Sequence, residues 1–250
     1  MLELDNIQKP VEIPFIVTRQ VKEVASVCNA LIESRDMGII YGEPGVGKSI
    51  TASHITEKWT KKGSLRVICI EADVGSTPLG IARKLITLLT DLRPGNSAEA
   101  ARIIENLTDK HQVDLIIVDE AERLNHRCLE MVRSIYDRTK IPVLLIGMND
   151  LVRHLRSHKK FYSRISTTYH YEPLSYQQLS EYLGQLHPLL KDIDPVLEKE
   201  LLDFIYQHSR GEFRRIIQMV KQAERVRRVN QHPVLSLSVF EAASKLMLKG

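Results

Sequence analysis

The sequence predicts an α/β protein in which helices sandwich a parallel sheet, followed by a smaller helical region. Short apolar runs alternate with helical stretches through the first two thirds of the chain, a pattern typical of parallel strands buried on both faces. A glycine-rich loop after the first run, and a pair of carboxylates ending a later run, strengthen this prediction. Strand-like runs stop near residue 172, where helical periodicity takes over.

Each element follows from its local pattern. Thr18 is expected to cap the first helix, after an extended arm that carries two prolines. Apolar runs predict five strands, at 37–41, 65–70, 113–118, 142–146 and 165–171. Helical periodicity predicts helices at 18–35, 50–59, 77–92, 97–110 and 127–139. We therefore predict an α/β core over residues 1–172, with 1–17 as its arm, and a helical lid over 173–250.

The glycine-rich loop is a complete P-loop, G-x-x-x-x-G-K-[ST], between a strand and a helix. Its residues are Gly42, Glu43, Pro44, Gly45, Val46, Gly47, Lys48 and Ser49, and the helix follows at Ile50. Backbone N–H groups of such a loop surround phosphates, the lysine reaches the β- and γ-phosphates, and the hydroxyl binds Mg²⁺. The sequence therefore predicts a site for a nucleoside triphosphate with Mg²⁺. ATP is favoured because no N-K-x-D guanine motif is present.

Polar residues at the ends of two later strands complete the predicted site. Asp119 and Glu120 end the third strand as a Walker B pair. We expect Asp119 to hold Mg²⁺ and Glu120 to polarise the attacking water. Asn149 follows the fourth strand, where its amide would orient that water; the alternative is an asparagine that caps a helix or turn.

With these motifs in this order, the chain resembles AAA+ ATPases. Two further stretches carry the resemblance: Phe161-Tyr-Ser-Arg164-Ile, similar to an arginine-finger element, and Gly211-Glu-Phe-Arg214, similar to a sensor 2 element. The resemblance implies that Arg164 reaches a neighbouring subunit's ATP and that Arg214 contacts the γ-phosphate of its own. The alternative for each arginine is a surface ion pair or a charge that steers phosphates.

Within AAA+ proteins, the chain resembles DNA-transposition regulators, the group of the phage Mu B protein and of TnsC-like and TniB-like ATPases. The P-loop and residues 115–124, 141–149 and 161–165 carry this resemblance, which spans about 15–228. It implies ATP-dependent rings or filaments on duplex DNA, released by hydrolysis, and delivery of target DNA to a transposase, with a target-site adaptor as a further partner. The residues implied to face DNA are Thr77, Arg83, Lys84, Arg123 and Arg127.

Composition permits the DNA partner without requiring it. The formal net charge is +4, and basic side chains cluster in 58–66, 151–171 and 210–228. Such clusters suit phosphate contacts, although a solvated face or a subunit interface explains each equally well. Two alternatives stay open: a secretion or remodelling ATPase of the ExeA type, and an ATP-gated adaptor that recruits a helicase or nuclease.

The location predicted for the protein is cytoplasmic, with no membrane partner. The longest apolar runs are too short to span a bilayer. The first residues lack the basic start and apolar stretch of a signal peptide. Three widely spaced cysteines, Cys28, Cys69 and Cys128, form no C-x-x-C pair and suit buried thiols in a reducing compartment.

Overall fold

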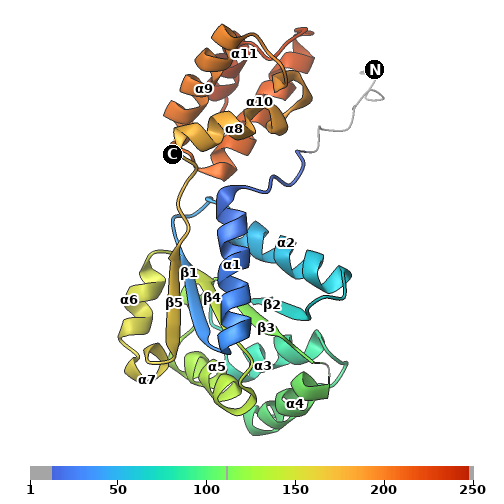
Figure 1. The fold of residues 1–250 in the computed structure, drawn as a ribbon, viewed down its shortest axis with the longest axis vertical. Coiled ribbons are helices and arrows are strands. Elements are labelled where there is room, and N and C mark those ends of the chain that lie inside the picture. The colour runs from blue at the N-terminus through green and yellow to red at the C-terminus, as the bar shows by residue number, and fades with distance from the viewer. Residues whose placement is uncertain (1–12, 111, 248–250) are drawn as a thin grey trace. The chain divides into compact units, whose positions relative to one another are not determined.

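Five parallel strands form the sheet of the first structural unit, residues 19–172 (Figure 1). The structure, a computed structural model, describes residues 13–110 and 112–247. The strands are β1 (Met37–Tyr41), β2 (Val67–Glu71), β3 (Leu115–Asp119), β4 (Val143–Gly147) and β5 (Ile165–His170). Their order across the sheet is β2-β3-β4-β1-β5, and every neighbouring pair is parallel. The predicted fold class, a helix-sandwiched parallel sheet of five strands, is confirmed.

Alternate residues of the central strands point to opposite faces of the sheet, and each face has its own core. Ile116 and Val118 of β3 pack in the core formed with the helices that follow β2 and β3. Leu115 and Ile117 pack in the core formed with the first two helices. One face carries α1 (Arg19–Ser34) and α2 (Lys48–Lys61), and the other carries α3 (Pro78–Thr87), α4 (Ser97–Lys110) and α5 (His126–Thr139). Burial on both faces explains why the strands are continuous apolar runs.

Local contacts explain where the elements differ from the prediction. Helix α3 ends at Thr87 rather than near residue 92, and Arg83 donates two hydrogen bonds to the Pro94 carbonyl (3.0 and 2.7 Å), which folds the loop back onto the helix. Three short elements were not predicted: η1 (Ala121–Arg123), α6 (Asp150–Arg156) and α7 (Lys159–Tyr162). They are too brief for periodicity to reveal.

The second unit, residues 13–18 with 173–247, is helical and has a separate core. Its elements are α8 (Tyr176–Leu186), η2 (Pro188–Leu190), α9 (Pro195–Ser209), α10 (Phe213–Val229) and α11 (Leu237–Lys245). Ile16 is buried in this core. The described part of the arm therefore packs with the helical unit, not with the α/β core to which the sequence analysis assigned it, because its apolar side chain is buried there.

None of the helices in the part of the chain that the structure describes has the length and apolar character that a membrane crossing needs.

A buried carboxylate anchors the helical unit. The Glu224 side chain is 7% exposed and accepts hydrogen bonds from Arg227 (2.6 and 2.9 Å) and Arg228 (2.5 Å), with His187 Nε2 3.5 Å away. The hydrogen bonds from Arg227 are the main reason that the pKa of Glu224 falls from 4.5 to about 2. Because the folded-state pKa is depressed, this stabilisation is complete above about pH 4.5 and is lost as the pH falls toward 2.

Replacing Glu224 with glutamine is therefore expected to lower the free energy of unfolding by about 1 to 3 kcal/mol at pH 7, with a smaller loss at pH 3. Urea unfolding at both pH values measures this difference. Glu241→Gln, at an exposed position on α11, is the control and should change stability little at either pH. An equal loss from Glu224→Gln at pH 7 and pH 3 would contradict the assigned role of the charge.

Candidate nucleotide site

The P-loop joins the carboxyl end of β1 to the start of α2. Gly47 has φ 118° and ψ 10°, in the left-handed region that glycine adopts without strain. Helix α2 begins at the next residue, Lys48. The backbone N–H of Thr51 donates a hydrogen bond to the Gly47 carbonyl oxygen (3.0 Å) in its first turn. The loop thus ends at a helix N-terminus, the arrangement that favours a bound phosphate.

Lys48 folds back over the loop. Its Nζ donates to the carbonyl oxygens of Gly42 and Glu43, at 2.8 Å each. Burial lowers the pKa of this ammonium, while the surrounding carboxylates, Asp119 first, raise it. The charge is therefore held beside the loop, within reach of a ligand that replaces the two carbonyl contacts.

Asp119 lies at the carboxyl end of β3, with only 9% of the residue exposed. Burial raises the pKa of its carboxyl, and a hydrogen bond with the Ser49 side chain opposes that rise. A hydroxyl and a carboxylate in contact are oxygen ligands of the kind that Mg²⁺ takes together with phosphates and water. In the described part of the chain no three His, Cys, Asp or Glu side chains gather as a metal group.

Glu120 follows Asp119 in a left-handed conformation (φ 54°, ψ 36°) that turns the chain sharply at the end of β3. Burial is the main cause that raises the pKa of its carboxyl, and the neighbouring Glu122 adds to the rise. Arg123 lies 3.5 Å from the Glu120 carboxylate and opposes the effect. The predicted base is therefore partly exposed and held between one acid and one arginine.

The Asn149 side chain contacts the P-loop. Asn149 occupies the residue before α6, yet its side chain makes no capping hydrogen bond; Nδ2 instead donates to Glu43 Oε1 at 2.5 Å. Because β4 lies between β3 and β1, the end of β4 lies between the P-loop and Asp119. The role of Asn149 in orienting water stays a prediction.

Sequence reasoning missed Glu122, which links two strand ends at this site. Its Oε2 accepts a hydrogen bond from Met148 N (3.2 Å) and fills the space beside Gly147, where a Cβ would lie 2.2 Å from the carboxylate. Glu122 thus connects the turn after β3 to the turn after β4. Its place two residues after Glu120 was the only signal in the sequence.

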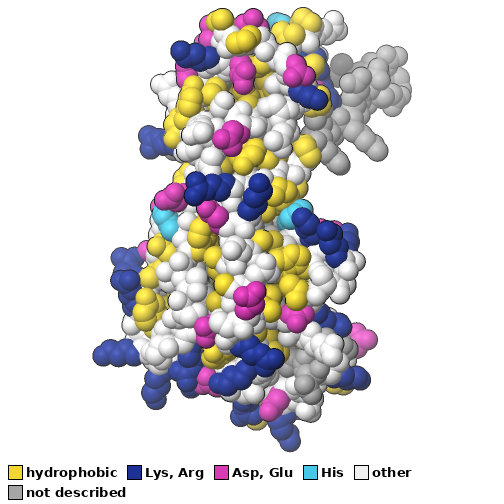
Figure 2. All heavy atoms as spheres, in the orientation of Figure 1, with side chains coloured by type: hydrophobic (Ala, Val, Ile, Leu, Met, Phe, Trp, Pro, Cys, Tyr) yellow, Lys and Arg dark blue, Asp and Glu magenta, His cyan; other side chains and the backbone are white. Residues whose placement is uncertain are grey.

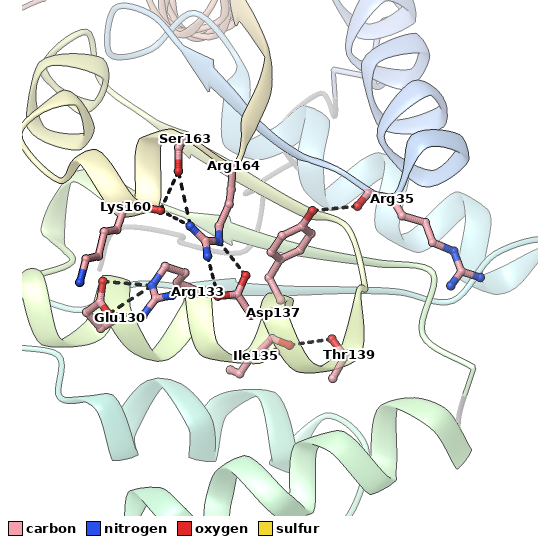
Figure 3. Close-up of polar contacts among 10 residues, drawn as sticks. Arg35, Glu130, Arg133, Ile135, Asp137, Thr139, Lys160, Ser163 and Arg164 are labelled. Atoms are coloured by element: carbon pink, nitrogen blue, oxygen red, sulfur yellow. Dashed lines mark hydrogen bonds and ion pairs between the residues drawn. The ribbon is translucent and has the colours of Figure 1, made fainter.

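Arg164 is held inside its own subunit (Figure 3). Its Nε and Nη2 donate to the two oxygens of Asp137 on α5 at 2.6 and 2.9 Å, and Nη1 donates to the Lys160 carbonyl. These bonds hold the pKa of Asp137 below its ordinary value. Arg133 also pairs with the Asp137 carboxylate, at 2.8 Å, and with the carboxylate of Glu130, at 2.6 Å. A finger role would require Arg164 to exchange Asp137 for a phosphate.

Arg214 lies in the other structural unit, exposed on the first turn of α10. Its neighbour Arg215 pairs with Glu212 at 3.1 Å. The contact of Arg214 with a γ-phosphate stays a prediction.

Four of the five residues implied to face DNA make contacts within the chain. Thr77 caps α3 through a hydrogen bond from Gly80 N (3.0 Å), and Arg83 binds the Pro94 carbonyl. Lys84 pairs with Asp73 at 2.6 Å, and Arg123 pairs with Glu71 at 3.1 Å. Arg127 is exposed on the first turn of α5. These contacts give the first four a structural role, and DNA binding by all five stays a prediction.

Basic side chains also gather on α6 and α7. Figure 2 shows Lys and Arg side chains over these helices, at the left of the view. They are Arg153, Arg156, Lys159 and Lys160. This basic corner adjoins Arg164 in sequence, so it suits either a nucleic acid or a second subunit.

The chain is similar to known proteins in sequence and in fold. Residues 32–155 match the family profile described as an AAA domain. A Staphylococcus aureus protein described as a potential ATP-binding protein is 26% identical over 266 residues, covering 94% of this chain and 97% of that protein.

Two solved structures from Aeropyrum pernix share the fold. The ORC2 protein, solved in ADPNP–ADP complexes, matches with a TM-score of 0.69 and 19% identity over 97% of this chain and 70% of that one. The ORC1 protein, solved in complex with DNA, matches with a TM-score of 0.68 and 15% identity over 94% of this chain and 66% of that one. At these identities the likeness shows a shared fold.

Proposed function

Because residues 32–155 match a family profile described as an AAA domain, we propose that the protein binds ATP with Mg²⁺ and hydrolyses it. One observation carries the proposal: the ends of β1, β3 and β4, neighbours in the sheet, carry the P-loop, the Asp119–Glu120 pair and Asn149. A half-buried lysine, a hydroxyl paired with a carboxylate, and a second carboxylate are the groups that phosphoryl transfer to water needs.

Each group has a defined task in this proposal. Lys48 leaves the two carbonyls and binds the β- and γ-phosphates. Ser49 and Asp119 hold Mg²⁺, which neutralises charge on the phosphates when bound. Asn149 orients a water molecule, and Glu120 accepts a proton from it as the water oxygen attacks the γ-phosphorus in line. The bond from the γ-phosphorus to the β,γ-bridging oxygen breaks, and ADP leaves with that oxygen while inorganic phosphate is released.

Two arginines complete the proposed reaction. Arg214 contacts the γ-phosphate within the subunit, and Arg164 reaches the ATP of a neighbour. An arginine supplied in this way is worth about 10³ to 10⁵ in rate, so turnover would depend on assembly of several copies.

We further propose that ATP-bound copies assemble on duplex DNA. The sequence pI of about 8.9 and the basic corner of α6 and α7 support contact with phosphates, and one solved relative by fold is a DNA complex. Delivery of that DNA to a transposase, with an adaptor choosing the target, rests on the motif resemblance alone.

Lys48→Ala is expected to weaken ATP binding by at least about tenfold, because it removes charge-assisted hydrogen bonds to phosphate, and to abolish ATP-dependent DNA binding. Titration with a fluorescent ATP analogue and a DNA mobility assay measure the two effects. Lys22→Ala, at an exposed position on α1, is the control. Unchanged DNA binding by Lys48→Ala would contradict the idea that nucleotide drives assembly.

Arg164→Ala is expected to abolish turnover alone and to regain it when mixed with Lys48→Ala subunits. In mixtures, an Arg164→Ala subunit supplies the intact P-loop, and a neighbouring Lys48→Ala subunit supplies the intact Arg164. Steady-state ATPase assays across mixing ratios measure the recovery, with Lys22→Ala, at an exposed position on α1, as a control that keeps its turnover. No recovery at any ratio would count against a role in trans.

A further inference from the structure

Tyr171 lies directly behind the P-loop, in the segment that leaves the sheet after β5. The residue is only 3% exposed and belongs to the core between the sheet and the first two helices. Its N–H donates to the Tyr41 carbonyl at 2.7 Å, at the end of β1. Two residues later, at Pro173, the chain enters the helical unit.

The Tyr171 side chain contacts the end of the P-loop. Its hydroxyl and the Thr51 hydroxyl share a buried hydrogen bond of 3.0 Å, and Thr51 N donates to the Gly47 carbonyl. A Cβ at Gly47 would lie 3.2 Å from the same tyrosine oxygen. The phenol therefore supports the turn from which the P-loop enters α2.

The Tyr171 backbone contacts the start of the loop. A Cβ at Gly42 would lie 2.3 Å from the Tyr171 carbonyl oxygen, so only glycine allows the two backbones to come this close. Tyr171 thus packs against both ends of the loop. Its carbonyl lies against Gly42, and its hydroxyl lies against Gly47.

We propose that Tyr171 is a positioning residue for nucleotide binding, which holds both ends of the P-loop in the shape that receives the phosphates. The loop contains residues at positive φ, Gly45 and Gly47, whose backbones have many accessible conformations. A loop that samples other shapes binds ligand in proportion to its competent fraction. Tyr171 raises that fraction without touching the nucleotide. The inference rests on the proposed ATP binding.

The test is the Kd of a fluorescent ATP analogue with Mg²⁺, measured on the full chain. Tyr171→Phe removes only the hydroxyl and is expected to raise Kd about fivefold, the factor equivalent to the net contribution of one hydrogen bond. Thr51→Val removes the partner hydroxyl and should have the same effect. The double variant should bind no more weakly than either single variant, because the two share one bond.

Tyr169→Phe is the matched control, because Tyr169 lies two residues earlier, on β5, and its hydroxyl donates to Glu23 of α1 at 2.5 Å, outside the P-loop. It should lower Tm in the absence of nucleotide as Tyr171→Phe does, yet leave Kd unchanged. A folded Tyr171→Phe protein with wild-type Kd, or effects of the two single variants that multiply in the double variant, would overturn the proposal. If Tyr171→Phe fails to fold, Thr51→Val decides it alone. Failure of the wild type to bind would overturn the proposed function itself.

Discussion

Strand β4 pairs in parallel with β3 on one side and β1 on the other, and the candidate site depends on this pairing. The registers align Gly147 with Tyr41 and Leu145 with Val118. Parallel strands present their carboxyl ends at one edge of the sheet. The P-loop, the Asp119–Glu120 pair and Asn149 therefore meet at one edge, although more than 100 residues separate the first from the last.

Two charged side chains at this edge of the sheet, Lys48 and Asp119, are partly or fully removed from solvent. Burial disfavours the charged forms of both Lys48 and Asp119. Lys48 compensates with backbone carbonyls, and Asp119 compensates with Ser49 and the Glu120 amide. A triphosphate with Mg²⁺ would offer each group a stronger partner. Arg164 likewise has a partner within the chain, because its guanidinium donates hydrogen bonds to both carboxylate oxygens of Asp137.

The sequence predicted the sheet and the motif-bearing loops because both depend on local pattern. Apolar runs bounded by turns located five strands within about two residues, and the P-loop spacing located Lys48 and Ser49. Partners distant in sequence left no local signal: Tyr171 and Thr51 are 120 residues apart, and Arg164 and Asp137 are 27 apart. The described part of the arm, residues 13–17, was misassigned for the same reason, because burial of Ile16 depends on packing, not on pattern.

In the function that we propose, ATP held at this edge switches the protein onto DNA. Negative-stain electron microscopy of the protein with duplex DNA tests it directly, comparing a non-hydrolysable ATP analogue with ADP. We expect rings or filaments on DNA with the ATP analogue and bare DNA with ADP. Bare DNA in both samples, or equal coating in both, would contradict it.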